Sequence, residues 1–358
     1  MARIVYGVAG EGSGHSSRAR EMANHMREAG HTVRLASYDR GYRNLKDDFD
    51  VLEIEGLGIA SGDNKVSVVK TFTENLKRLP EGYRTLQRLR RALFKEFRPD
   101  CVITDFEPMT AYLANHYALP LITIDNQHGM RYIEYDVPPA LTADARLTQY
   151  IIRAMVPRPD VSLVTAFWSG RTKNDRTFVF PPIVRRAVLE SQTSRGDHIL
   201  VYLTSGYRSF LELLARFGRE RFVVYGYERS ERVGNLTYKR SSHNGFLDDL
   251  ARAKAVMATA GFTLISEALY LRKPYLALPM RGQFEQELNA YQLEQQGYGK
   301  RVSQAGLEAI ADFLDRLPQY RERLEQYQPA GNHAIQAKLD ALLADGCALA
   351  RRFHEQRA

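Results

Sequence analysis

The stretch Thr259–Ala290 reads TAGFTLISEALYLRKPYLALPMRGQFEQELNA, and it decides the fold of this chain. A short apolar strand ends near Met257, a glycine turn follows at Gly261, and a helix is predicted from about Thr263. Glycine lets the backbone come close to a ligand, and the N-terminus of a helix offers N–H groups and a partial positive charge. The stretch therefore predicts a phosphate-binding turn between a strand and a helix.

Acidic and amide side chains follow this turn. Glu267 lies one helical turn inside the predicted helix, within reach of hydroxyls attached to a bound phosphate. After a strand at Tyr275–Leu278, a predicted loop carries Gln283, Glu285 and Gln286, whose side chains can bind further hydroxyls. A ligand with a phosphate at the turn, a first sugar near Glu267 and a second sugar near Glu285 and Gln286 would be a nucleotide-sugar.

Length and composition limit the class of protein. A chain of 358 residues is expected to form two domains. It has no apolar run long enough for a membrane span, and its start, MARIVYGVAG, leads into a glycine loop instead of a signal-peptide core. Cys101 and Cys347 cannot make a disulfide framework or a zinc site, which fits a reducing cytoplasm. The net charge of +8 is spread along the chain, so no nucleic-acid partner is expected.

The N-terminal segment predicts the opening of a doubly wound sheet. A buried strand at Arg3–Val8 runs into the loop AGEGSGH, followed by a helix over about Ser16–Ala29 and a strand at His31–Ser37. The loop fits neither a dinucleotide fingerprint, since His15 or Ser17 stands where the third glycine belongs, nor a P-loop, since no lysine follows. His15 follows the carboxyl end of a strand, where α/β sheets bind ligands, and this favours a functional role over that of a helix start.

Polar side chains follow two more predicted strands of this sheet. Asp105 comes directly after a strand at Cys101–Thr104, and Asp125 and His128 follow a strand at Leu121–Ile124. The carboxyl ends of parallel strands meet at one edge, so these side chains are expected near the loop that ends in His15. Two alternatives stay open at this point, namely helix capping for Asp105 and an ordinary hydrogen-bonded loop position for His128.

The strand and helix patterns restart in the second half of the chain. Residues 183–196 are polar and lack a strong period, so they are taken as a linker between residues 1–182 and residues 197–358. Both halves alternate strands and helices at the spacing of a parallel sheet. The predicted fold class is therefore α/β, with two Rossmann-like doubly wound domains facing a cleft, the second carrying terminal helices.

One basic segment, residues 64–98, is predicted to be partly helical. It contains ten Lys or Arg against three Glu. Its second half has apolar residues at helical spacing: Leu86, Leu89, Leu93 and Phe97. Two interpretations stay open, a solvated helical face and a basic surface that touches anionic lipid.

Several of these motifs resemble a known family. The motifs Thr259–Thr263, Ser266–Leu269, Lys273-Pro274, Pro279 and Glu285-Gln286-x-x-Asn289-Ala290 resemble the donor-binding region of GT-B glycosyltransferases, above all MurG-type UDP-N-acetylglucosaminyltransferases. The loop Gly10–His15 with Arg18 is similar to the matching N-terminal loop. ITDFEP at 103–108 and IDNQH at 124–128 resemble an uncharacterised MurG-like branch. The resemblance covers nearly the whole chain.

The resemblance implies roles for both halves. In the first half, His15 would be the general base, with Asp105 or Asp125 orienting its ring, while Gly14, Asp125 and His128 would line the acceptor cleft. In the second half, the donor-binding residues would be Gly261, Phe262 and Thr263 at the diphosphate, Glu267 at the ribose, Glu285 and Gln286 at the sugar, and Phe246 near the base.

The implied reaction is an inverting transfer of a hexosyl group from a UDP-sugar to an acceptor hydroxyl, in which histidine takes the proton. No Asp-x-Asp motif is present, so the reaction is expected to need no metal, and the nucleotide-sugar is a co-substrate with no separate cofactor. The acceptor is open: a lipid-linked intermediate, a cell-surface polymer precursor or a small molecule. The expected location is the cytoplasm, with peripheral contact to the inner face of the membrane. A nucleotide-sugar hydrolase on the same fold and a non-catalytic nucleotide-sugar binder remain alternatives.

Overall fold

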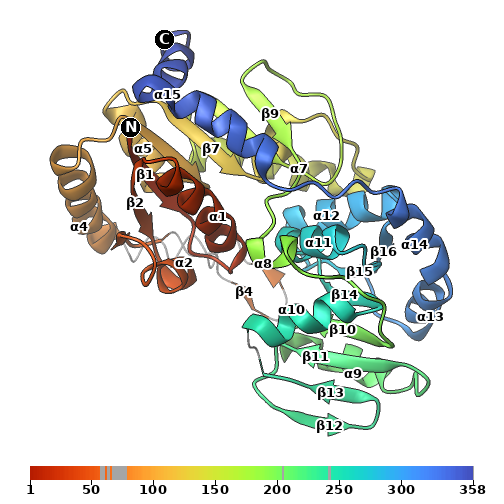
Figure 1. Cartoon of the computed structure of the whole chain (residues 1–358). Helices are drawn as coiled ribbons and strands as arrows, with labels where there is room; N and C mark the ends of the chain where they lie inside the picture. Colours follow the sequence, from red (N-terminus) through yellow and green to blue (C-terminus); the bar gives the residue numbers. More distant parts are fainter. Residues whose placement is uncertain (57–60, 63–64, 67–78, 204, 241–242, 358) are drawn as a thin grey trace. The chain divides into compact units, whose positions relative to one another are not determined.

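The computed structural model describes residues 1–56, 61–62, 65–66, 79–203, 205–240 and 243–357. These residues form two compact units, shown in Figure 1. Unit 1 consists of Met1–Ser61, Ser67–Arg185 and Gly331–Ala358, and unit 2 consists of Gly62–Val66 and Arg186–Ala330. Each unit is built on its own seven-stranded sheet.

The sheet of unit 1 has the strand order β3-β2-β1-β6-β7-β8-β9, and all its neighbouring strands are parallel. The strands are β1 (Arg3–Val8), β2 (Thr32–Ser37), β3 (Val51–Glu53), β6 (Cys101–Asp105), β7 (Leu121–Asp125), β8 (Val161–Thr165) and β9 (Thr177–Phe180). The middle strands β6, β7 and β8 are buried at every residue, as expected for a parallel sheet that helices cover on both faces.

Two apolar cores lie on the two faces of this sheet. One contains Ile4, Tyr6 and Val8 together with residues of α1 (Gly14–Glu28), α2 (Asp39–Leu45) and α15 (His333–Glu355). The other contains Val5 together with residues of α4 (Leu79–Leu89), the π-helix η1 (Arg90–Glu96), α5 (Pro108–His116) and the end of α7 (Thr142–Met155). Two short helices, α6 (Gly129–Tyr132) and η2 (Pro139–Leu141), lead from β7 into α7. The alternation along β1 thus distributes successive side chains between the two cores.

The C-terminal helix α15 belongs to unit 1, whereas the sequence placed all of residues 197–358 in the second domain. Leu339, Leu342 and Leu343 of α15 pack in the same core as the methionines of α1, and Figure 1 shows α15 in blue beside α1 in red. Asn332, just before α15, anchors the chain where it comes back to unit 1. Its side-chain amide accepts from Val184 N at 3.0 Å and donates to Val184 O at 2.9 Å. The apolar stripe of α15 therefore completes the first core instead of extending the second.

The sheet of unit 2 has the order β12-β13-β11-β10-β14-β15-β16, and only β12 and β13 pair antiparallel among its described strands. The strands are β10 (His198–Tyr202), β11 (Arg221–Tyr225), β12 (Glu231–Val233), β13 (Leu236–Tyr238), β14 (Ala255–Thr259), β15 (Tyr275–Leu278) and β16 (Gly299–Arg301). The helices are α8 (Arg186–Leu189), η3 (Ser205–Tyr207), α9 (Arg208–Leu214), α10 (His243–Arg252), α11 (Phe262–Tyr270), α12 (Phe284–Gln295), α13 (Leu307–Asp315) and α14 (Leu317–Glu325). The short strands β4 (Ser61–Gly62) and β5 (Lys65–Val66) form a separate ribbon.

The two parallel α/β sheets confirm the predicted fold class. One local prediction is wrong: the expected loop with Gln283, Glu285 and Gln286 is the start of α12, with Gln283 as its N-cap. Glu285 and Glu287 in the first turn explain the helix, since acidic side chains there interact favourably with the helix dipole.

The basic segment 64–98 is described only in part, because residues 64 and 67–78 lie outside the described residues. In the remainder, α4 and η1 bear out the predicted amphipathic helix, and Leu89 and Leu93 are buried. Among the helices of the described residues, none combines the length and apolar composition that a bilayer crossing requires.

Candidate functional site

The parallel register of unit 1 brings the loop after β1 against the end of β6. Val8 lies beside Asp105, the last residue of β6, and Ala9 N donates to Asp105 O at 3.0 Å. The loop that follows Ala9 therefore starts next to a buried carboxylate, at the carboxyl edge where parallel sheets carry their sites.

Two glycines shape this loop for different reasons. A Cβ on Gly10 would lie 2.1 Å from Tyr38 O, so only glycine permits this close approach. Gly12 has a φ of +71°, which lies in the left-handed region that favours glycine. The loop ends at Gly14, the first residue of α1, and His15 follows in the first turn of that helix.

His15 and Asp105 form a hydrogen-bonded pair. His15 Nδ1 lies 2.7 Å from Asp105 Oδ1, and Asp105 is fully buried while the His15 side chain keeps 14% of its exposure. A carboxylate only accepts hydrogen bonds, so this contact places the imidazole proton on Nδ1. Nε2 of the neutral ring then keeps its lone pair, which is the arrangement of a general base.

Arg18 completes the group on the same helix, one turn after His15. Its Nε donates to Asp105 Oδ2 at 2.8 Å, its Nη2 to Asp105 Oδ1 at 2.7 Å, and its Nη1 to Asn126 Oδ1 at 3.0 Å. Burial by itself raises the pKa of Asp105, but Arg18 and His15 outweigh burial and hold that pKa below its usual value. Burial likewise opposes the charge of Arg18, yet Asp105 raises the pKa of the guanidinium. Asp105 is therefore an anion shared between an arginine and a histidine.

Asp125 was considered as an alternative to Asp105 for orienting the His15 ring, but in the structure it binds His128. Its Oδ2 lies 2.7 Å from His128 Nδ1, its Oδ1 accepts from His128 N at 2.8 Å, and both side chains are fully buried. The His128 ring stacks on Tyr132 and meets the edge of Phe106. Of the two aspartates, Asp105 contacts His15, and Asp125 orders the turn that presents Asn126 to Arg18.

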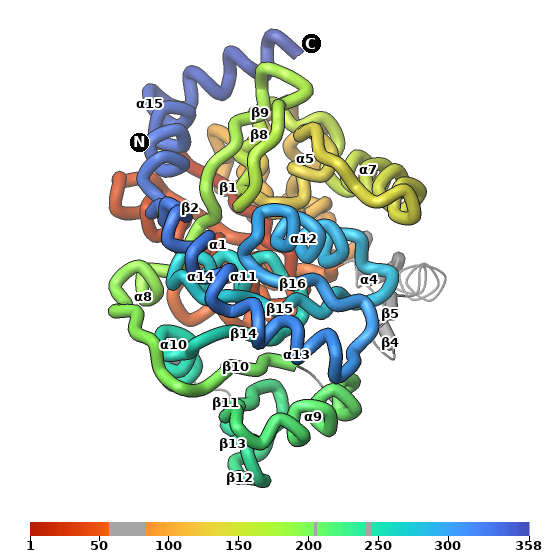
Figure 2. Tube along the Cα trace, turned by 90° about the vertical axis from the view of Figure 1, so that its right-hand side faces the viewer, coloured from red at the N-terminus to blue at the C-terminus, as the bar shows by residue number. Residues whose placement is uncertain are grey.

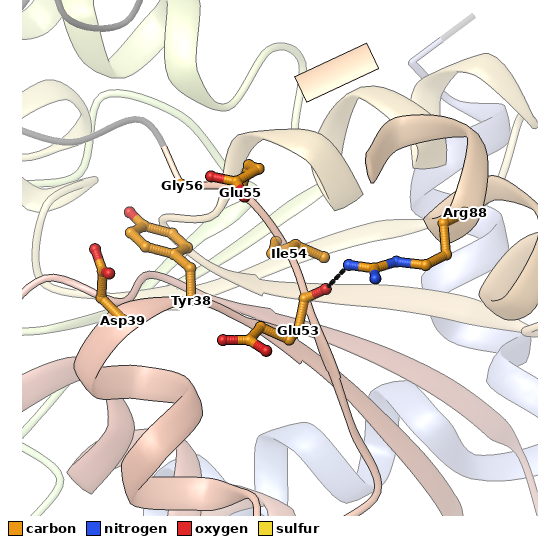
Figure 3. Close-up of a pocket in the computed structure, with 7 residues that line it drawn as sticks. All are labelled: Tyr38, Asp39, Glu53, Ile54, Glu55, Gly56 and Arg88. Atoms are coloured by element: carbon orange, nitrogen blue, oxygen red, sulfur yellow. Dashed lines mark hydrogen bonds between the residues drawn. The ribbon is translucent and has the colours of Figure 1, made fainter. Parts of the chain in front are cut away.

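A hollow of about 340 Å³ lies at the carboxyl ends of β2 and β3. Figure 3 shows Arg88 donating to the backbone oxygen of Glu53 across it. The lining is largely polar and includes three acidic residues and one arginine: Tyr38, Asp39, Glu53, Ile54, Glu55, Gly56 and Arg88. Tyr38 also backs Gly10, so the hollow adjoins the loop that leads to His15.

In unit 2, the turn after β14 opens onto unfilled space. Gly261 is the N-cap of α11, and a Cβ built on it would meet no described atom within 4 Å. Asn289 Nδ2 donates to Ala260 O at 3.1 Å and the Tyr275 hydroxyl donates to Thr259 O at 2.7 Å, so the two carbonyls before Gly261 are held in place. Phe262 and Thr263 follow in the first turn of α11, where N–H groups lack intrahelical acceptors. This geometry can receive an anion.

The predicted sugar-binding side chains lie on α11 and α12. Glu267 is buried in α11, one turn after Thr263. Gln286 is buried, and its Oε1 accepts from Met280 N at 3.0 Å, which ties the first turn of α12 to the segment after β15. Glu285 is half-buried in the same turn. The structure thus buries Glu267 within α11 and ties Gln286 of α12 to the backbone of Met280.

Phe246 lies in an aromatic cluster at the carboxyl ends of β10 and β11. Its ring meets Tyr202 at 5.5 Å and Tyr225 at 5.1 Å between centroids, both edge to face. The Tyr225 hydroxyl donates to Asp249 Oδ2 at 2.6 Å, and Lys239 binds the same carboxylate at 2.7 Å. Tyr202 remains 37% exposed, so this cluster offers an aromatic surface to a ligand.

Four residues of these sites received no role from the sequence: Arg18, Asn126, Tyr275 and Asn289. Arg18 had a usable signal, since a residue three positions after His15 lies on the same helical face. Tyr275 and Asn289 act on backbone oxygens far away in the chain, and no local pattern reveals such contacts.

We predict that Arg18→Met lowers the free energy of unfolding by about 3–5 kcal/mol, because it leaves the buried Asp105 carboxylate without its main counter-charge. The depressed pKa of Asp105 means that its contribution is present at neutral pH and is lost as the pH falls through that pKa, so urea unfolding is measured at neutral pH. Arg20→Met is the matched control. Arg20 also lies on α1, but it binds Asp48 at the surface, so its loss should lower the free energy of unfolding by less than about 1 kcal/mol. Equal losses in the two variants would contradict the assignment.

The family of the chain follows from comparison with known proteins. The model of glycosyl transferase family 1 matches residues 2–318. An uncharacterized glycosyltransferase of Methanosarcina mazei is 25% identical over 91% of this chain and 93% of its own length. A second, from Methanosarcina acetivorans, is 26% identical over 84% of each chain.

Solved structures share the fold. The calicheamicin glycosyltransferase CalG4 superposes with a TM-score of 0.66 at 16% identity and covers 96% of this chain and 99% of its own. The spinosyn rhamnosyltransferase SpnG gives a TM-score of 0.62 at 15% identity, over 94% of this chain and 100% of its own. The chain therefore belongs to glycosyl transferase family 1 and is a glycosyltransferase that transfers a sugar from a nucleotide-sugar donor.

Proposed function

We propose that this glycosyltransferase is inverting, works without a metal and moves a hexosyl group from a UDP-sugar to an acceptor hydroxyl. The observation that carries the proposal is the His15–Asp105 contact of 2.7 Å, with Arg18 holding the carboxylate. In a single displacement, the acceptor oxygen attacks the anomeric carbon from the face opposite the leaving diphosphate. One base is then needed on the acceptor side, and inversion is the outcome.

Unit 1 is the proposed acceptor half. His15 Nε2 takes the proton of the acceptor hydroxyl as the new C–O bond forms, and Asp105 stabilises the imidazolium through Nδ1. Arg18 keeps Asp105 ionised and oriented, so it acts as a positioning residue. Asp125 and His128 support this arrangement through Asn126, which binds Arg18, and Gly14 starts the helix that carries His15.

Unit 2 is the proposed donor half. The open space at Gly261 and the first turn of α11, with Phe262 and Thr263, suit the diphosphate. As the diphosphate leaves, negative charge develops on it, and the fixed helix dipole stabilises that charge without reorganisation. Glu267 is assigned to the ribose hydroxyls.

The donor's sugar and base are assigned to the remaining positions in unit 2. Glu285 and Gln286 are assigned to the sugar, and the aromatic cluster around Phe246 is assigned to the base. The segments ITDFEP at 103–108 and IDNQH at 124–128 support an uncharacterised MurG-like branch as the nearer relation, which is part of this proposal.

Two finer points belong to the same proposal. The acceptor is a hydroxyl compound, either lipid-linked for cell-surface glycan or glycolipid synthesis or a small molecule such as the names of the calicheamicin and spinosyn enzymes suggest. The polar hollow of Figure 3 adjoins the His15 loop and is suited to hydroxyl groups.

The function is tested by following UDP release from a panel of UDP-sugars with and without candidate acceptors. We expect release that requires an acceptor, persists in EDTA and gives a product of inverted anomeric configuration by NMR. Release that needs no acceptor would instead identify a nucleotide-sugar hydrolase. No release, combined with thermal stabilisation by UDP, would identify a non-catalytic binder.

We predict that His15→Ala reduces transfer by about 10²–10⁴-fold, the usual contribution of a general base, while UDP affinity stays near that of the wild type. His25→Ala is the matched control, because His25 lies on the same helix and also contacts an aspartate, Asp340, at 2.8 Å. Turnover that survives in His15→Ala, or falls equally in His25→Ala, would remove His15 as the base.

We predict that Glu267→Ala weakens UDP binding by about 1–3 kcal/mol, the cost of losing hydrogen bonds to a charged group. Isothermal titration calorimetry measures the affinity, and Glu267→Gln, which keeps the side-chain shape, reports how much of the loss is due to the charge. Glu308→Ala in the exposed first turn of α13 is the control. If UDP affinity is unaltered in both Glu267 variants, this side chain does not bind the ribose.

A further inference from the structure

Helix α7 turns an apolar stripe toward solvent. Its buried side is formed by Ala145 and Ile152. On the opposite side, Leu147, Tyr150 and Ile151 are 50%, 69% and 44% exposed. These three residues follow the i, i+3, i+4 spacing and so lie on one helical face. The helix therefore packs on unit 1 with one face and leaves an apolar face uncovered.

The neighbouring helix α5 extends this face. Tyr112 is 52% exposed, and its hydroxyl donates to the backbone oxygen of Ala154 in α7 at 2.8 Å. Figure 2 shows α7, in yellow, beside α5 at the margin of unit 1. We name Tyr112, Leu147, Tyr150 and Ile151 the α7 patch. Seven large hydrophobic side chains are exposed in the described parts of the chain, and four of them lie in this patch, so the clustering marks an interaction surface.

Cationic side chains border the α7 patch. Arg146 and Arg153 are exposed, and their spacing of two helical turns places both on the same margin of the stripe. Neither has an ion-pair partner among the residues that the structure describes. The one acidic residue of α7, Asp144, lies in its first turn, and the whole chain carries a net charge of +8. The margin is therefore positively charged on a positively charged protein.

The charge around the α7 patch indicates what kind of partner can cover it. A second copy of the chain would bring its own Arg146 and Arg153 to the same apolar face, where like charges repel. An anionic bilayer offers the complement: an apolar interior for Leu147 and Ile151, an interfacial region suited to tyrosine, and phosphate groups for arginine.

We propose that the α7 patch is a docking surface for an anionic membrane. Leu147, Tyr150 and Ile151 enter the boundary between headgroups and acyl chains, and Arg146 and Arg153 bind lipid phosphates. The surface lies on α5 and α7, outside the basic segment 64–98, and the proposal does not depend on the chemistry of sugar transfer.

The full chain is tested by co-sedimentation with vesicles of phosphatidylcholine alone and of phosphatidylcholine with about one third phosphatidylglycerol. We expect at least about tenfold tighter binding to the anionic vesicles, weakened by salt. The double variant Tyr150→Ser/Ile151→Ser should lose about tenfold in affinity for them, and Arg146→Glu/Arg153→Glu at least as much. All four side chains are exposed, so both variants should fold, which circular dichroism checks.

Matched controls separate this surface from general effects. Arg216→Glu/Arg219→Glu changes the net charge equally at exposed positions in unit 2, and Val233→Ser removes a side chain that is 53% exposed on β12. Both controls should bind within about twofold of the wild type. The proposal is overturned if the wild type ignores anionic vesicles, or if the patch variants bind as well as the controls. It is equally overturned if sedimentation velocity finds a dimer that Tyr150→Ser/Ile151→Ser disrupts, because a second copy would then cover the patch.

Discussion

One buried carboxylate determines the geometry of the first unit's site. Asp105 has no exposure to water, so its charge is tolerated only because Arg18 donates two hydrogen bonds and His15 a third. Both partners lie on α1, three residues apart, which fixes the rotation of this helix against the sheet. A small rotation of α1 would leave part of the carboxylate without a donor, at a cost of several kcal/mol. The orientation of His15 is therefore set by the Arg18–Asp105 ion pair, which the fold needs whether or not a reaction takes place.

The turn at Gly261 in unit 2 is arranged by different means. Neutral donors on Asn289 and Tyr275 hold the two carbonyls that precede Gly261. These two hydrogen bonds add no negative charge to the turn, and the N-terminus of α11 favours a ligand that carries negative charge.

The sequence identified the residues at the edge of the first sheet but could not pair them. Asp105 and Asp125 each end a buried strand and precede a short helix, so local pattern makes them equivalent. The strand order separates them, because β1 pairs with β6 and not with β7, and only Asp105 reaches the loop after β1. The destination of α15 was missed for a similar reason: its apolar stripe fits either sheet, and the buried amide of Asn332 on Val184 selects the first. Both outcomes depend on contacts between distant residues, which periodicity does not encode.

Helix α7 shows the same limit in another form. Apolar residues occur on two opposite sides of this helix, with Ala145 and Ile152 on one side and Leu147, Tyr150 and Ile151 on the other, so the sequence alone does not show which side is buried. The fold buries only the first side, since the second faces away from the sheet. Burial of apolar surface is favourable by roughly 25 cal/mol per Å², so any surface that removes these side chains from water gains free energy. The arginines at the margin restrict which surface can do so, because desolvating them without anionic partners would cancel the gain. Apolar content and charge together therefore favour a partner that is apolar inside and anionic at its boundary.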